Sequence, residues 1–138
     1  MKSNKLHNFD KVQFEKFLRE ARRLAREVAG TEICGLIIDT GHQLSFVPTR
    51  NVSSRVGSFA LSRPDVRRVV AATKILGQKV VGTFHSHPVG IATPGKSDIK
   101  YAVDGSLIFI FDCIGRKGSL WKIKNGKAHS LNFDFTSP

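Results

Sequence analysis

The sequence has few cysteines, few acidic residues and no long apolar run. Only Cys34 and Cys113 occur in 138 residues, and no C-x-x-C pair is present. Neither a disulfide framework nor a cysteine-based zinc ribbon is therefore expected. No apolar stretch approaches the roughly 20 residues of a membrane-spanning helix, and the first ten residues lack the apolar core of a secretory signal. These absences predict a cytoplasmic protein with no membrane segment, stabilised by its hydrophobic core.

Acidic residues are outnumbered two to one, with 22 Lys and Arg against 11 Asp and Glu and a formal net charge of +11. Such an excess favours acidic partners but does not choose between nucleic acid, an anionic membrane surface and an acidic protein. It is equally typical of a solvated basic surface. The length and the 41% of hydrophobic residues predict one domain over residues 1–138, with its core at about 32–135 after an N-terminal helix.

Hydrophobic periodicity predicts alternating helices and strands. We expect helices at about residues 10–28, 62–76 and, for a short one, 97–103. Ser62 and Asp65 have the spacing of a capping box at the start of the second of these helices, and Gly77 is expected to end it. We expect strands at residues 32–39, 43–49, 80–84, 107–112, 120–124 and 128–133. Turns are expected at residues 115–118 and at Asn125-Gly126. This order predicts an α/β fold with a mixed sheet covered by helices.

The segment Phe84–Asp98, with the sequence FHSHPVGIATPGKSD, is the most informative part of the chain. His85 and His87 are two residues apart at the end of a predicted strand, so both imidazoles lie on the same face and can share one metal ion. The pair alone is weak evidence, but Pro88 and the spacing to Asp98 make it specific. Catalytic zinc commonly takes His, His and a carboxylate and keeps a fourth position for water. Asp98 follows a Pro/Gly-rich loop that can fold back onto the histidines.

A hydrolytic zinc site also needs a general base, because a proton must travel from the water to the leaving group. Glu32 is the best candidate in the sequence. It begins a predicted strand in the otherwise apolar run TEICGLIID, where a charge is unfavourable unless it has a partner. Asp104 and Asp112 are less well placed by this argument.

Together these residues resemble the JAMM (JAB/MPN-domain) metalloprotease pattern of Glu, HxHP, Ser and Asp. The resemblance rests on Glu32 within EICGLI, VPTRN at residues 47–51, Phe59, HSHP and Asp98 eleven residues after the second histidine. It extends from about Glu32 to Asp112, and the compact prokaryotic members are the nearest in length.

The resemblance implies a three-layer α-β-α, cytidine-deaminase-like fold with one zinc ion per chain. Carried over residue by residue, His85, His87 and Asp98 would be the zinc ligands and Glu32 the general acid/base. The implied activity is hydrolysis of peptide or isopeptide bonds, often next to the C-terminus of ubiquitin or a ubiquitin-like protein. The expected partner is therefore a protein or peptide substrate, including a ubiquitin-like protein with an extended C-terminal tail.

One position departs from the family pattern and keeps alternatives open. The family's Ser falls on Gly95, and the loss of one oxyanion donor typically lowers the rate by about 10² to 10³. Ser97 or Thr93 can substitute only if the loop has a different shape. A catalytically weakened or inactive MPN-like zinc-binding module is therefore the first alternative, and a basic nucleic-acid-binding domain is the second. A zinc deaminase is excluded, since the chain has neither H-x-E nor P-C-x-x-C.

Overall fold

The computed structural model describes residues 10–27, 33–53, 59–87, 103–112 and 117–131. It contains helices α1 (Lys11–Glu27) and α2 (Arg63–Leu76). Its strands are β1 (Cys34–Asp39), β2 (Leu44–Thr49), β3 (Lys79–His87), β4 (Leu107–Asp112), β5 (Lys117–Lys124) and β6 (Lys127–Ser130). Neither of these two helices has the length and apolar character needed to cross a membrane. The short helix expected at 97–103 lies outside the described residues.

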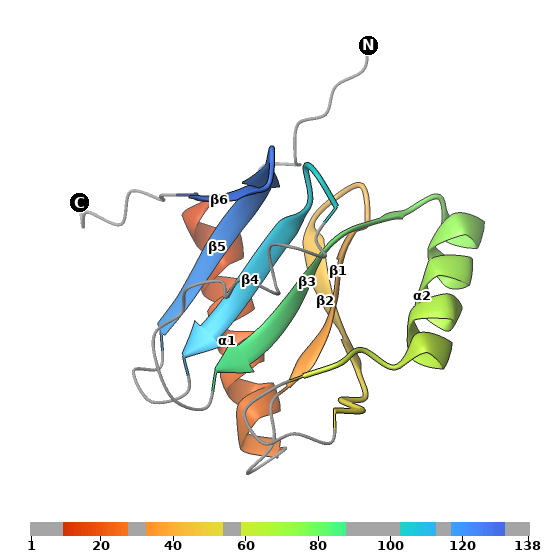
Figure 1. Cartoon of the computed structure of the whole chain (residues 1–138), viewed down its shortest axis with the longest axis horizontal. Helices are drawn as coiled ribbons and strands as arrows, with labels where there is room; N and C mark the ends of the chain where they lie inside the picture. Colours follow the sequence, from red (N-terminus) through yellow and green to blue (C-terminus); the bar gives the residue numbers. More distant parts are fainter. Residues whose placement is uncertain (1–9, 28–32, 54–58, 88–102, 113–116, 132–138) are drawn as a thin grey trace.

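The six strands form one mixed sheet in the order β2-β1-β3-β4-β5-β6. β3 and β4 are parallel, and every other neighbouring pair is antiparallel. β4 has the run LIFIFD, and its first five residues are buried, as is typical of a central strand covered on both faces. Strands β1 to β3 lie between α1 and α2 (Figure 1). The α/β class and the mixed sheet predicted from the sequence are confirmed.

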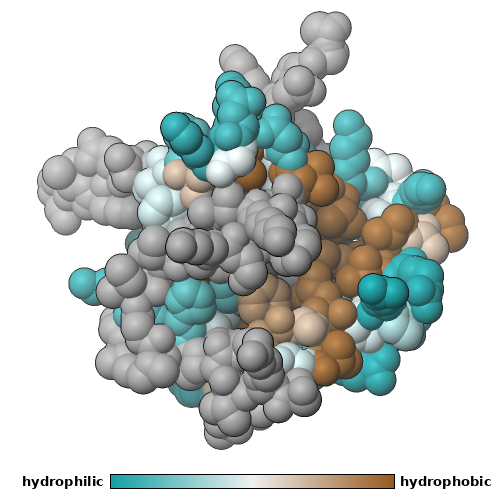
Figure 2. Space-filling view, viewed as in Figure 1, coloured by the Kyte–Doolittle hydropathy of each residue, from teal (hydrophilic) through white to brown (hydrophobic). Residues whose placement is uncertain are grey.

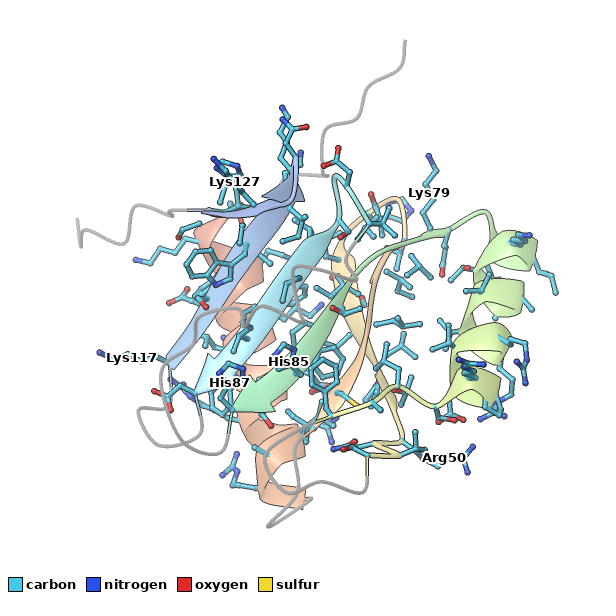
Figure 3. All side chains as sticks on the ribbon, viewed as in Figure 1. Arg50, Lys79, His85, His87, Lys117 and Lys127 are labelled. Carbon is cyan, nitrogen blue, oxygen red and sulfur yellow. The ribbon has the colours of Figure 1, made fainter. Side chains whose placement is uncertain are left out.

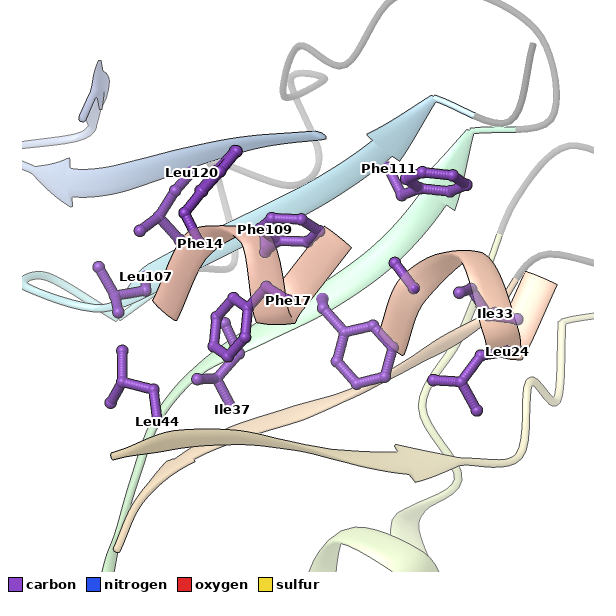
Figure 4. Close-up of a cluster of buried hydrophobic side chains, with 12 residues drawn as sticks. Phe14, Phe17, Leu24, Ile33, Ile37, Leu44, Leu107, Phe109, Phe111 and Leu120 are labelled. Atoms are coloured by element: carbon purple, nitrogen blue, oxygen red, sulfur yellow. The ribbon is translucent and has the colours of Figure 1, made fainter. Parts of the chain in front are cut away.

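Helix α1 packs its apolar side onto one face of the sheet and forms the main core (Figure 4). The ring of Phe109 in β4 is fully buried and meets Phe14 and Phe17 of α1 edge to face, with centroids 5.8 and 5.5 Å apart. Phe46 of β2 stacks on Phe84 of β3 at 4.2 Å. Edge-to-face and offset aromatic contacts are favourable beyond their burial. The apolar spacing expected at residues 10–28 therefore corresponds to a buried helix face.

Helix α2 has the predicted ends but only part of the predicted capping box. The Ser62 side chain accepts a hydrogen bond from the Asp65 backbone N–H, and Gly77 ends the helix at a φ of 68°. The Asp65 carboxylate does not return to Ser62 but binds the backbone N–H of Arg50 at 2.9 Å. Ile75 and Leu76 remain 84% and 66% exposed. Apolar side chains gather between the sheet and α2 on the face shown in Figure 2.

The turn predicted at residues 115–118 is wrong at Lys117 and Gly118, because both residues belong to β5. Gly118 pairs with Phe111 in β4. A Cβ atom at Gly118 would lie 2.6 Å from the Phe109 ring and 2.7 Å from Leu18. This glycine is therefore required by close packing beneath α1 and not by a turn. The predicted turn at Asn125-Gly126 is confirmed, with φ values of 54° and 72° that are typical of a type I′ hairpin.

Candidate functional site

His85 and His87 lie together at the C-terminal end of β3, which extends three residues beyond the predicted boundary at Phe84. Their imidazoles stand on the same face of the sheet (Figure 3), as the alternation of a strand requires. The two Nε2 atoms are 3.1 Å apart. His85 is buried, with 1% of its surface exposed, and His87 is half-buried. The strand therefore directs two imidazole nitrogens to one point at the border of the core.

This separation fits two ligands of a single tetrahedral metal ion. Zinc binds histidine nitrogen at about 2.0–2.1 Å, so two nitrogens in a tetrahedral site lie about 3.3 Å apart. The observed 3.1 Å between the Nε2 atoms is close to that value. Imidazole pairs of this kind suit zinc and other borderline metals. Within the part of the chain that the structure describes, no third His, Cys, Asp or Glu completes a metal-binding group. The predicted ligand Asp98 lies outside that part.

Ser86, between the two histidines, points to the opposite face and holds the beginning of β1. Its hydroxyl accepts a hydrogen bond from the Ile33 N–H at 2.9 Å, and its own N–H donates to the Ile33 carbonyl at 3.0 Å. Both residues are buried. The hydroxyl thus satisfies a backbone donor at the point where β1 begins. Since Ile33 follows Glu32 in the chain, this contact links the histidine strand to the segment that carries the predicted base.

Replacing Ser86 with alanine is expected to lower the free energy of unfolding by about 1–3 kcal/mol, because the buried Ile33 N–H loses its acceptor. Urea denaturation measures this loss, and hydrogen exchange at the Ile33 amide locates it. Ser106→Ala is the matched control, since the Ser106 hydroxyl bonds the Val103 carbonyl in an exposed turn. The control is expected to change stability by less than about 0.5 kcal/mol. An equal loss in both variants would show that the Ser86–Ile33 contact contributes nothing specific.

The two alternative acidic residues occupy different places. Asp104 accepts a hydrogen bond from the Asn125 N–H at 2.6 Å, so it is engaged at the hairpin turn. Asp112 pairs in register with His87 across the parallel β3–β4 ladder, and paired residues share a face. Asp112 is half-buried. Of these two carboxylates, Asp112 is therefore the one beside the histidines.

An aromatic ring covers His85. Phe59, in the connection between β2 and α2, stacks on the His85 imidazole with centroids 4.1 Å apart and planes 19° from parallel. The His85 and His87 rings are themselves tilted by 45° at 5.0 Å. The surroundings of His85 are therefore formed by its own strand, β3, and by the connection between β2 and α2.

The end of β2 is anchored to the beginning of α2 by an ion pair. The Arg50 side chain donates from Nε to Asp65 Oδ2 at 3.2 Å, and Arg68 also pairs with Asp65. The Arg50 side-chain and backbone hydrogen bonds lower the pKa of Asp65 from 3.8 to about 2. Because the folded-state pKa is lowered, this pairing stabilises the fold above pH 4 and loses its effect as the pH falls towards 2. The anchor holds the connection that carries Phe59.

Cys34 is the cross-strand neighbour of His85 in the β1–β3 ladder. Its side chain is buried, with 1% exposed, and its Sγ lies 3.9 Å from the Thr49 carbonyl oxygen and 3.8 Å from that of Arg50. These contacts are typical of a small buried side chain with a weak S–H donor. Cys34 therefore packs next to the site against the end of β2.

Of the predicted site residues, the structure brings His85 and His87 together. Glu32, Asp98, Gly95 and the alternative hydroxyl residues Ser97 and Thr93 lie outside the described residues. The sequence interpretation missed the structural role of Ser86. It also missed Asn51, whose side-chain oxygen accepts hydrogen bonds from the N–H groups of Ser53 and Ala60 at 3.0 Å each. A polar residue between two predicted ligands was the available signal for Ser86, and a turn-favouring Asn after a strand was the signal for Asn51.

Comparison with known protein families identifies the family of this chain. The model of the prokaryotic homologs of the JAB domain matches residues 14–127, which is most of the chain and includes both histidines. The chain belongs to the prokaryotic JAB domain family. No curated protein matches this chain.

Solved structures share the fold of this prokaryotic JAB domain. A protein from Desulfitobacterium hafniense has a TM-score of 0.67 and 22% identity, over 90% of this chain and 88% of that one. A protein from Salinibacter ruber has a TM-score of 0.60 and 22% identity, over 89% and 92%. A JAB1/MPN domain protein from Archaeoglobus fulgidus has a TM-score of 0.50 and 18% identity, over 85% and 89%. At these identities the likeness establishes the fold.

Proposed function

We propose that this chain is a zinc-dependent hydrolase of peptide or isopeptide bonds. The observation that carries the proposal is the convergence of His85 Nε2 and His87 Nε2, 3.1 Å apart at the end of β3, in a JAB-family chain. In this proposal Asp98 is the third zinc ligand, with one ion per chain, and Glu32 is the general acid/base. The ligand set is of the His, His and carboxylate kind that catalytic zinc sites use.

The chain's own residues divide the chemistry between them. A bound zinc ion would supply Lewis acidity, polarising the scissile carbonyl and lowering the pKa of the attacking water towards 7. The Glu32 carboxylate would accept the proton of this water and pass it to the departing amine. The Ser86–Ile33 contact supports this assignment, because it fixes the strand that follows Glu32 against the histidine strand. Burial of His85 limits the access of bulk water to that side of the site.

For the substrate, we propose a protein or peptide with an extended segment next to the scissile bond, including the C-terminal tail of a ubiquitin-like protein. β2 forms one edge of the sheet, and an extended peptide can pair with such an edge. The net charge of +11 favours an acidic partner surface.

The competing proposal is a zinc-binding module with weakened or no catalysis. It is favoured by Gly95, which stands where the family pattern has Ser. The two proposals share the metal ligands and differ in turnover. Only an activity measurement therefore separates them.

The first experiment is elemental analysis of tag-free protein prepared without added zinc. The wild type is expected to contain about one zinc per chain, and His87→Ala is expected to lose it. His129→Ala is the matched control, because His129 is an exposed histidine on β6 and should leave the zinc content unchanged. Absence of zinc from the wild type even after supplementation would overturn both zinc proposals.

The second experiment measures cleavage of a ubiquitin-like protein that carries a peptide beyond its C-terminal tail. Turnover by the wild type that stops on zinc removal supports the hydrolase. Zinc-loaded wild type without turnover, combined with turnover in Gly95→Ser, would show that the natural chain is the inactive module.

A further inference from the structure

Phe59 is placed to determine the orientation of His85. A histidine ring rotates about a broad, two-fold χ2 torsion, so a strand fixes the position of the imidazole more firmly than its direction. Metal-binding histidines are normally oriented by a further contact from the surrounding residues. At His85 the Phe59 ring lies nearly parallel to the imidazole at 4.1 Å. An imidazole under that ring cannot rotate its plane away from that of Phe59 without clashing or losing the contact.

The chain around Phe59 is closed by hydrogen bonds at its neck. The Asn51 side-chain oxygen accepts the N–H groups of Ser53 and Ala60, each at 3.0 Å. The Val52 N–H donates to the Ala60 carbonyl at 2.9 Å, and Asn51 forms an isolated bridge with Leu61. Ala60 directly follows Phe59. The same amide oxygen therefore joins the two sides of the loop at the residue next to the stacked ring.

We propose that Phe59 is a positioning residue for the metal ligand His85, and that Asn51 acts through Phe59 by closing the loop neck. The stack holds the plane of the His85 ring in the orientation in which its Nε2 lies 3.1 Å from the Nε2 of His87. The loop neck holds Phe59 over the strand. This inference rests on the proposed zinc site and adds two residues to it, neither of which contacts the metal.

Zinc affinity, measured by competition with a chelator of known affinity, tests the proposal. Phe59→Leu keeps an apolar side chain but removes the flat ring, and it is expected to weaken zinc binding about 10-fold, at the lower end of the 10- to 100-fold range for lost supporting contacts. Phe59→Tyr keeps the ring and is expected to stay within about 3-fold of the wild type.

Asn51 provides an independent pair of variants. Asn51→Ala removes the acceptor and is expected to weaken zinc binding in the same direction as Phe59→Leu. Asn51→Asp keeps an oxygen that accepts both N–H groups and is expected to restore wild-type affinity. Val52→Ala is the matched control in the same neck, since Val52 is 57% exposed and its backbone bond is retained.

Two readouts separate positioning from general destabilisation and from failure of the zinc site. Denaturant midpoints show whether a variant merely unfolds, and the NMR signals of the His85 ring in the metal-free protein report its orientation directly. If the wild type and Phe59→Leu bind zinc equally well and the His85 signals are unchanged, this inference alone is overturned. Equal weakening by Phe59→Leu and Phe59→Tyr would also overturn it. Wild type that binds no zinc would overturn the proposed function and this inference with it.

Discussion

Replacing Glu32 with glutamine is expected to lower turnover by about 10² to 10⁴-fold, the usual contribution of a general acid/base. Glutamine has nearly the same shape as glutamate but cannot accept the proton of the attacking water. Since Glu32 is proposed as a base and not as a ligand, the zinc content is expected to remain near one per chain. Steady-state kcat with elemental analysis of the same sample measures both quantities.

Glu20→Gln is the control for this variant. Glu20 lies on α1, where its carboxylate pairs with Arg23 at 2.8 Å and its pKa is lowered chiefly by that hydrogen bond. Loss of the Glu20 charge is expected to leave kcat unchanged. Loss of zinc from Glu32→Gln would contradict the assignment, because it would make Glu32 a ligand. If turnover is unchanged, another acidic residue must be the general acid/base. Asp112, in register with His87, is then the residue to replace.

The elements that sequence reasoning predicted well are those determined by local signals. The uninterrupted run LIFIFD gave the bounds of β4 at residues 107–112 without error. Asn125-Gly126 predicted a hairpin turn because both residues tolerate positive φ. Ser62 and Gly77 marked the two ends of α2 through cap chemistry. Each of these signals acts over a few residues, and distant parts of the chain do not alter it.

The features that could not be predicted depend on partners far away in the sequence. A glycine at residue 118 suggested a turn, but it is explained by the Phe109 ring and Leu18 packed against it. Asp65 had the spacing for a capping box, but Arg50 binds it instead. The three-dimensional partner of each residue, and not its local pattern, determines these outcomes.

The same distinction applies to the candidate site. Period-two alternation correctly predicted that His85 and His87 share a face. It also requires Ser86 to face the other side, but alternation gives no partner for its hydroxyl. That partner, Ile33, is fixed only by the β1–β3 register. The Phe59 stack likewise requires the loop neck to bring residue 59 over the strand.

Zinc is expected to raise the thermal stability of the wild type strongly. An ion that binds only the folded chain stabilises it by about 4 kcal/mol at a free concentration of 1,000 times Kd. For a domain of this size that corresponds to a rise in Tm of roughly 8 to 16 °C. The effect follows from the geometry, because the two Nε2 atoms are brought to 3.1 Å only when β3 is formed. Thermal unfolding with buffered zinc and after chelation measures it.

His87→Ala is expected to abolish this shift while changing the metal-free Tm little, because His87 is half-buried at the last position of β3. His129→Ala should keep the full shift, since that exposed residue lies on β6. Magnesium should give none, because it prefers oxygen ligands. A rise in Tm that survives in His87→Ala would mean that zinc binds elsewhere on the chain. If the Tm of the zinc-loaded wild type does not fall on chelation, the folded and unfolded chains hold the ion equally. The preformed pair of histidines at the end of β3 would then have no thermodynamic role.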